Sequence, residues 1–339
     1  MDKNLSQTLD LLRQESDTIP YPVFGGLSDL SRSDMALLQA AWSHWSLTRR
    51  QKLIQALNVR ARARVELDYT MILLWTLADA DPTVRRLSIE GLREDDDESL
   101  IPLFVQALQT DPDAEVRAAA AKALGQFVLL GEYEEIAVAN AGGVLPALLA
   151  TVASASELLS VRRQAVEAVG YASDQRARAV IEDAYRDEDE AMQASALRAM
   201  GNSADRHWNK TVRDALDSHS HVKRLAAVYA AGELEIQAAA PRLIILLDDP
   251  DPAMRRAAVT ALGTVGGPLA RPALQAVFRA EDDDLELLAA DALETLDFNS
   301  QGLTDADDEF GDELDDEIDD EKEDDEDDDQ NVADDDFDD

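Results

Sequence analysis

Apolar residues recur along this chain at the spacing of one helical face. In the segment 113–125, Val116, Ala119, Ala120, Ala123 and Leu124 stand at relative positions 0, 3, 4, 7 and 8. Side chains three and four residues apart lie on the same side of an α-helix, so this pattern predicts a helix with one buried face. Segments around residues 100–108 and 241–247 have the same period and predict partner helices.

The pattern is also an internal repeat. An acidic turn, Val or Met, often Arg, an Ala-rich stretch and Leu-Gly or its equivalent recur in segments ending at residues 93, 125, 170, 201, 232, 263 and 294. The ends are 31 or 32 residues apart, except for one step of 45. A helix pair cannot cover its own apolar face, so such pairs stack. We predict an all-α fold, an α-solenoid of about eight antiparallel helix pairs with the second helices lining a concave face.

The predicted second helices carry start and stop signals. Asp-Pro opens the segments 81–93 and 251–263, where aspartate accepts hydrogen bonds from the first helical amides and proline suits the first turn. The glycine that ends most copies, such as Gly125 or Gly201, is interpreted as the left-handed residue that terminates the helix.

The single step of 45 residues indicates an insertion. About 14 extra residues, roughly 126–139, are expected to lengthen a helix or to add a loop at one edge of the solenoid, with a role that the sequence leaves open. The uncharged run 136–156 contains Asn140, two glycines and Pro146, and it lies in phase with the repeats. We therefore do not interpret it as a membrane span.

Composition agrees with helices and divides the chain. The 339 residues are 45% hydrophobic but only 5% aromatic, which disfavours an all-β fold. The net charge is −40, and residues 305–339 alone contain 24 acidic residues against one basic residue, Lys322. Such a segment repels itself and has little to bury, which predicts disorder. We divide the chain into an N-terminal helix and lead-in (1–30), the solenoid (31–300) and an acidic disordered tail (301–339).

Composition also excludes several kinds of chemistry. The chain has no cysteine, which rules out disulfides, thiol catalysis and thiolate metal sites. Its acidity disfavours binding of nucleic acid. The N-terminal segment has early acids and no apolar core of a secretory signal, so we expect a cytoplasmic protein.

The repeats resemble the HEAT-repeat superfamily over roughly residues 35–296. Their short, Ala-rich form is similar to the repeats of bilin lyases (PBS lyase HEAT-like), and the chain resembles bacterial HEAT-repeat proteins of uncharacterised role. The resemblance implies an armadillo-like helical solenoid. It is nearly silent on activity, because most members are scaffolds or adaptors and a few are enzymes.

Arginines follow the acidic turns at a helical spacing. Arg85, Arg117 and Arg255 lie four residues beyond Asp81, Asp113 and Asp251. This spacing lets a carboxylate and a guanidinium meet on one helical turn. The resemblance implies that such pairs form a ladder between repeats. An anion site is the alternative, although Gln193 and Glu286 interrupt the row.

The four histidines do not predict a metal centre. HEAT-like deoxyhypusine hydroxylases hold iron through His-Glu pairs on several helices, and this chain has no His-Glu dipeptide. His219 and His221 are two residues apart and would point in different directions from a helix. We predict neither metal nor cofactor.

One basic segment is a candidate interaction site. Residues 48–65 contain six basic residues and no acid: Arg49, Arg50, Lys52, Arg60, Arg62 and Arg64. They form either an ordinary amphipathic surface, a docking site for an acidic partner or the chain's own tail, or a nucleic-acid site. The neighbouring Trp42 and Trp45, like Trp75 and Trp208, are interpreted as packing residues.

The acidic tail contains a second candidate. Phe310, Leu314 and Ile318 are four residues apart, so a transient helix would gather them on one stripe with acidic borders. Such a stripe is typical of segments that fold on binding. The alternatives are a purely solubilising tail, weak divalent-ion binding, or docking on the basic segment.

These observations favour a non-enzymatic interaction scaffold or adaptor that binds a protein partner on its concave face. The alternative is an enzyme or enzyme subunit of the bilin-lyase-like kind. A deep concave pocket with converging Tyr, His and Arg side chains would indicate that alternative.

Overall fold

The structure, a computed structural model, describes residues 5–14, 18–137, 141–280 and 284–299. These residues contain α-helices and short 3₁₀ turns, and no strand occurs among them. Two helices precede the repeats, α1 (Leu5–Arg13) and α2 (Tyr21–Leu27). The tail, with Phe310, Leu314 and Ile318, lies outside the described residues.

Eight helix pairs follow within the described ranges, as the repeat pattern predicts. The first helices are α3 (Arg32–Trp42), α5 (Thr70–Thr76), α7 (Leu100–Thr110), α10 (Val144–Ala153), α12 (Gln175–Tyr185), α14 (Asn209–Ala215), α16 (Ala240–Leu246) and α18 (Ala270–Arg279). The second helices are α4 (Leu47–Ala63), α6 (Pro82–Leu92), α8 (Ala114–Glu132), α11 (Leu159–Val169), α13 (Glu190–Asn202), α15 (His221–Glu233), α17 (Pro252–Val265) and the helix 284–299. Two 3₁₀ turns, η1 (Arg206–Trp208) and η2 (Gln237–Ala239), introduce α14 and α16.

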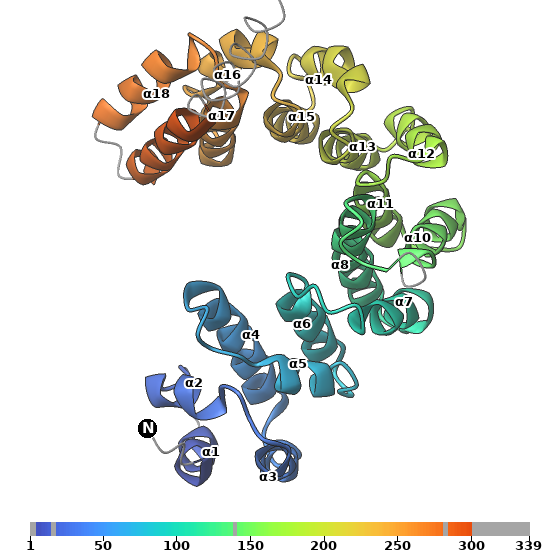
Figure 1. Ribbon diagram of the computed structural model, residues 1–339, viewed down its shortest axis with the longest axis vertical. Helices are drawn as coiled ribbons and strands as arrows, with labels where there is room; N and C mark the ends of the chain where they lie inside the picture. Colours follow the sequence, from blue (N-terminus) through green and yellow to red (C-terminus); the bar gives the residue numbers. More distant parts are fainter. Residues whose placement is uncertain (1–4, 15–17, 138–140, 281–283, 300–339) are drawn as a thin grey trace, which may run out of the picture.

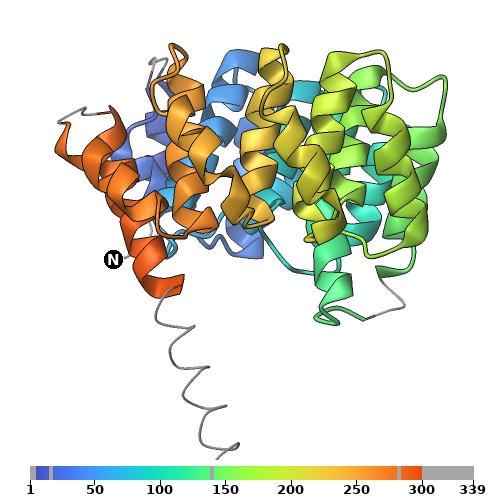
Figure 2. The same ribbon diagram turned by 90° about the horizontal axis from the view of Figure 1, so that it is seen from above.

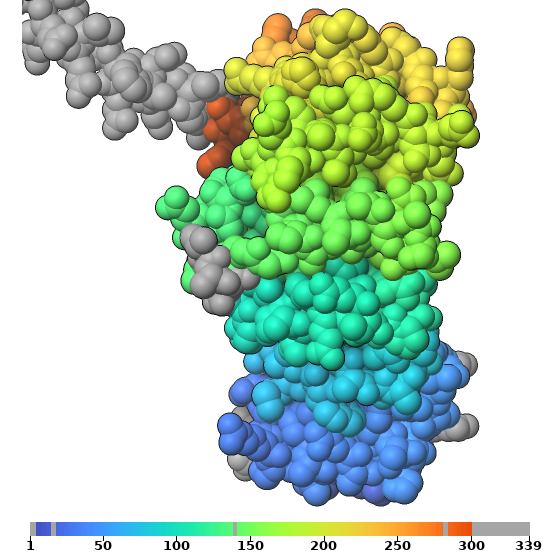
Figure 3. Space-filling model, turned by 90° about the vertical axis from the view of Figure 1, so that its right-hand side faces the viewer, coloured from blue at the N-terminus to red at the C-terminus, as the bar shows by residue number. Residues whose placement is uncertain are grey.

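The pairs stack into a strongly curved solenoid. From α4 to α17, each second helix packs against the second helix of the next pair, and these helices line the inner, concave side (Figure 1). The first helices form the outer side, which appears as continuous bands of stacked pairs in Figure 3. Because of the curvature, the first and last pairs lie on the same side of the molecule (Figures 1 and 2). The concave face predicted from the repeats is therefore formed by the second helices.

The acidic turns start the second helices as predicted. The side chains of Asp81, Asp113, Asp189 and Asp251 each accept a hydrogen bond from an amide of the first turn. Pro82 and Pro252 occupy the first helical position after two of these caps. Each cap satisfies an amide that has no partner inside the helix.

The repeat glycines, in contrast, do not terminate the helices as predicted. None of them has positive φ, and Gly125, Gly201, Gly232 and Gly263 lie inside helices. The left-handed residues come three positions later, at Ala204, Glu235 and Gly266 in three of the repeats.

Close packing explains these glycines instead. A Cβ on Gly170 would lie 2.5 Å from the carbonyl oxygen of Ala199 and 2.6 Å from its Cα atom. A Cβ on Gly201 would lie 2.9 Å from the Cα atom of Ala230 in α15. The repeated Gly and Ala thus let successive second helices approach closely along the inner side, which the sequence pattern alone did not show.

The predicted insertion lengthens a helix. The helix α8 has 19 residues, whereas α11, the next second helix, has 11. It runs on to Glu132, and α10 begins only at Val144. In Figure 2, α8 extends beyond the neighbouring helices at one edge of the solenoid. This confirms the expected helix extension.

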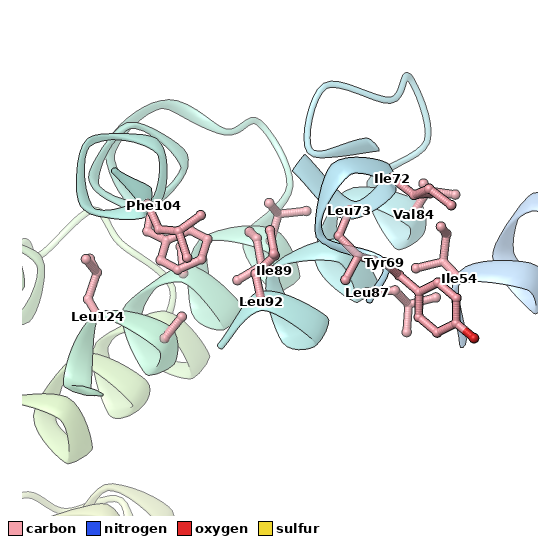
Figure 4. Close-up of a cluster of buried hydrophobic side chains, with 14 of the residues drawn as sticks. Ile54, Tyr69, Ile72, Leu73, Val84, Leu87, Ile89, Leu92, Phe104 and Leu124 are labelled. Carbon is pink, nitrogen blue, oxygen red and sulfur yellow. The ribbon is translucent and has the colours of Figure 1, made fainter. Parts of the chain in front are cut away.

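The core runs the length of the solenoid. Side chains such as Leu73, Ile89, Phe104 and Leu124 point toward one another between successive pairs (Figure 4). The buried residues of α1 and α2 belong to the same cluster as those of the first four pairs. A second cluster extends from Val166 to Leu296, and Val152 and Val180 pack against both. The N-terminal helices are therefore continuous with the repeats in their packing.

The tryptophans are packing residues, as predicted. Trp42, Trp45 and Trp208 are buried, and the rings of Trp45 and Trp75 lie 5.6 and 5.3 Å from that of Trp42. The Trp42 indole donates a 2.7 Å hydrogen bond to Asp79, so its polar group is satisfied within the fold.

Candidate functional site

An arginine ladder joins consecutive repeats. The Nε and Nη2 atoms of Arg85 each donate a 2.8 Å hydrogen bond to the carboxylate of Asp111. Its Nη1 atom donates to the carbonyls of Asp79 and Ala80. Arg117 repeats the arrangement, with 2.9 and 2.8 Å bonds to the carboxylate of Glu157 and a bond to the Asp111 carbonyl.

The ladder corrects the predicted pairing. The aspartates four residues before these arginines are helix caps, and the arginines bind acids of the next repeat. Further along, Arg224 and Arg255 bind turn carbonyls. The Nε, Nη1 and Nη2 atoms of Arg85 and Arg117 all donate to protein acceptors, so this part of the row is structural and does not support the anion-site alternative.

Burial and hydrogen bonding shift the pKa values of Asp111 and Glu157, the two carboxylates that the ladder arginines bind. Burial of the Asp111 carboxylate acts to raise its pKa, but hydrogen bonds from Arg85 and the Asp113 amide outweigh it and the pKa lies below its ordinary value. The hydrogen bonds from Arg117 likewise lower the pKa of Glu157. Both carboxylates are therefore held in the charged form.

A basic groove opens on the concave face across four consecutive second helices. We define the basic groove by its five cations, which are Arg62 on α4, Arg86 and Arg93 at α6, Lys122 on α8 and Arg163 on α11. The cavity has a volume of about 470 Å³, and two acids, Glu90 and Glu115, are also among its lining residues. The groove lining therefore has a net positive charge, whereas the whole chain has a net charge of −40.

Several groove cations are only partly neutralised. Arg86 pairs with Glu90 on the same helix. Arg163 donates through Nε to the hydroxyl of Ser195, which in turn donates to Glu167. Arg62 and Lys122 are exposed and form no ion pair with any described residue. The groove therefore offers several cations to a ligand that spans the helices.

A tyrosine cluster lies further along the second helices. The Tyr229 hydroxyl donates a 2.9 Å bond to Oδ1 of Asn202, whose amide donates to the carbonyl of Glu167. The guanidinium of Arg198 lies over the Tyr229 ring, 5.7 Å from its centroid. Tyr171, which packs against Gly125 of α8, lies close enough to Tyr229 for the two hydroxyls to influence each other's pKa.

Reduced hydration marks this cluster. Burial raises the pKa of both tyrosine hydroxyls. The carboxyl of Glu233 is accessible, but the concave surface around it limits its hydration and raises its pKa. The cluster contains two tyrosines and an arginine, which the sequence analysis did not bring together, but none of the cavities described here is lined by it.

The structure separates the six residues of the predicted basic segment. Arg49 is only 5% exposed, and it donates to the carbonyls of Leu12 and Gln14 at the end of α1. Arg50 pairs with the buried carboxylate of Asp79 at 3.2 Å. Both are therefore structural residues, which corrects their assignment to an exposed docking surface.

The other four residues of the segment face different surroundings. Arg60 lies over the rings of Tyr21 and Phe24, at 5.2 and 4.9 Å. Arg64 pairs with Glu66 at the surface, and Lys52 is half-buried. Only Arg62 reaches the basic groove.

The remaining groove cations come from repeats that are far apart in the sequence. Arg86 directly follows the ladder arginine Arg85, Arg163 occupies the position equivalent to Arg86 in its own copy, and Lys122 occupies the position equivalent to Glu90. The sequence feature that could have predicted the groove was thus the basic residues at equivalent positions of successive copies. The density of basic residues within one segment did not predict it.

Metal and membrane candidates were also tested by the structure. His221 lies 2.8 Å from Asp251, and the described residues contain no cluster of three or more His, Asp or Glu side chains suited to a metal ion. Within the described part of the chain, no helix has the length and apolar character to cross a membrane.

Comparisons with known proteins concern the fold. The family model of HEAT repeats matches residues 70–139 and 209–294. No curated protein matches the chain significantly.

Several solved structures are similar at low identity. The complex of CpcE and CpcF of phycocyanin lyase from Nostoc sp. PCC7120 is 16% identical, with 67% of this chain and 94% of that chain covered and a TM-score of 0.44. Human deoxyhypusine hydroxylase in complex with glycerol is 18% identical, with 87% and 96% covered and a TM-score of 0.34. A designed armadillo repeat protein in complex with the peptide (KR)4 is 20% identical, with 58% and 99% covered and a TM-score of 0.37.

Proposed function

Because the chain is a HEAT-repeat solenoid, we propose that it is a non-enzymatic interaction scaffold that binds a protein partner on its concave face. The observation that carries the proposal is the basic groove on α4, α6, α8 and α11. Its cations come from four consecutive second helices and line one cavity. Such spacing suits an extended ligand that crosses the inner helices.

The charge of the groove indicates the chemistry of the partner. Five basic side chains against two acidic ones complement an acidic peptide segment. Contacts of this kind steer association and weaken with salt, since the charges are partly exposed. The proposed partner is therefore a protein with an exposed acidic segment.

A charge reversal in the groove tests this proposal. The double variant Arg62→Glu, Lys122→Glu changes two exposed groove side chains that have no ion-pair partner among the described residues. The matched control, Lys210→Glu with Arg213→Glu, makes the same charge change on the outer helix α14. Each tagged full chain would be used for co-purification from native extract at two salt concentrations.

The expected result is a partner that the wild type and the control retain at low salt and the groove variant loses. A partner retained equally by all three chains would contradict the assignment of the binding surface. Recovery of a coloured or small-molecule adduct without a protein partner would instead favour the enzyme alternative.

The enzyme alternative, of the bilin-lyase-like kind, has one feature in its support. Arg198 on α13 and Tyr229 on α15 gather with Tyr171, in the turn after α11, around Asn202 and Glu233. An activity that uses this cluster would be lost in Tyr229→Phe, which removes the hydroxyl and keeps the ring. Turnover that survives stringent purification and disappears in this variant would replace the scaffold proposal.

A further inference from the structure

The basic groove belongs to a chain of net charge −40, and the same chain carries a concentrated acidic segment. Residues 305–339 contain 24 acidic residues and one basic residue, whereas the groove gathers five cations in one cavity. Further along the inner surface, Glu167 and Glu233 are acidic and would repel such a segment. The groove is thus a described concave surface with a charge that attracts it.

The connection is long enough to reach the groove. Forty residues follow Asn299, the last described residue. A fully extended segment of that length spans ~130 Å. The helix 284–299 is four second helices away from α11, or ~40 Å at ~10 Å per layer, and the curvature shortens the direct path (Figure 1).

We propose that the chain's own acidic segment, residues 305–339, occupies the basic groove in the absence of a partner and competes with acidic partners for it. This inference rests on the proposed function, because it concerns the occupancy of the same surface. A tethered segment has an effective concentration in the millimolar range, so even weak electrostatic binding fills the groove. A partner must then displace the segment, so only a partner that binds the groove more tightly than a minimum affinity can occupy it.

The contact surface indicates how this docking responds to solution conditions. The groove is lined mainly by charged and polar groups, with Ala118 and Ala119 as its apolar lining residues. Attraction therefore comes chiefly from charge, and salt screens it over ~10 Å at 0.1 M and ~3 Å at 1 M. Docking is expected at low ionic strength and is expected to be lost at high ionic strength.

Intramolecular energy transfer in the full chain tests the proposal directly. The chain has no cysteine, so Ser156→Cys, exposed in the turn before α11, and Ala333→Cys in the acidic segment accept a dye pair at two defined positions. We expect transfer efficiency to fall about twofold between ~0.1 M and ~1 M salt. At low salt, Arg62→Glu with Lys122→Glu should lower it to the high-salt value, and the control Lys210→Glu with Arg213→Glu should leave it unchanged.

Other outcomes would overturn the inference. Equal transfer in the wild type and the groove variant at low salt would show that the segment does not occupy the groove. A single-stranded oligonucleotide that displaces the segment at lower concentration than a synthetic 305–339 peptide would assign the groove to nucleic acid.

The two proposals can fail separately. If Arg62→Glu with Lys122→Glu loses its protein partner but keeps the energy-transfer efficiency of the wild type, the docking inference is wrong and the proposed function stands. If transfer depends on the groove but partner binding does not, the proposed function is wrong and the docking stands.

Discussion

The guanidinium of Arg85 and the carboxylate of Asp111 face each other across the boundary between two helix pairs, joined by two hydrogen bonds of 2.8 Å. Their side chains are only 13% and 10% exposed, so water screens the pair weakly. The pair connects the start of α6 to the turn before α8. It shows how the solenoid couples one repeat to the next with polar contacts as well as apolar ones.

Removal of the charge on Asp111 should weaken this coupling. The variant Asp111→Asn keeps the size of the side chain but leaves a partly buried guanidinium without its counter-ion, and we expect a loss of ~2 kcal/mol in the free energy of unfolding. Urea denaturation followed by circular dichroism measures it. The exposed Lys210–Asp214 pair, at 79% and 62% exposure, is the comparison, and Asp214→Asn should change stability by less than ~0.5 kcal/mol.

The pair of Arg117 and Glu157 should make stability depend on acid pH. Hydrogen bonding by Arg117 lowers the pKa of Glu157 below its ordinary value of 4.5. A carboxyl whose pKa is lower in the folded than in the unfolded state stabilises the fold at any pH above its unfolded-state pKa. This contribution is lost as the pH falls through the folded-state pKa. The wild type should therefore exceed Glu157→Gln in melting temperature at pH 7, and the difference should shrink below pH ~4. A difference that stays constant from pH 7 to pH 3 would contradict this.

A side chain at Gly170 should force two second helices apart. The added Cβ of Gly170→Ala would lie 2.5 Å from a backbone oxygen of Ala199, which cannot yield without a shift of α13. We expect a destabilisation of ~1–3 kcal/mol in urea denaturation. Gly25→Ala is the control, because a Cβ there meets nothing within 4 Å and α2 should gain ~0.5–1 kcal/mol. Equal effects of the two substitutions would refute the close-packing explanation.

Arg49 should hold the N-terminal helix in place. Its guanidinium donates to carbonyls at the C-terminal end of α1, at 3.0–3.2 Å from Gln14 and Leu12. Arg49→Ala removes these charge-assisted bonds, worth ~1.5–3 kcal/mol, and should speed hydrogen exchange of the amides in α1. Arg62→Ala, from the same basic segment but exposed, should leave that exchange unchanged.

Much of the architecture follows from local sequence patterns. The spacing of Val116, Ala120 and Leu124 requires one buried helical face, and an aspartate caps the second helices α6, α8, α13 and α17. The period near 31 residues requires stacked pairs, and the longer step predicts an insertion, which the structure shows to lengthen α8. These features depend on residues within one or two turns of each other, so they can be read along the chain.

The tertiary structure alone decided what depends on neighbouring repeats. It gave Arg85 the carboxylate of Asp111 in place of Asp81, and it placed Gly170 against Ala199. It also buried Arg49 and gathered Arg62, Lys122 and Arg163 into one groove. The physical reason is that the rotation between successive pairs, and hence the curvature, determines which equivalent positions meet. That rotation results from packing between helices that start 31 to 45 residues apart.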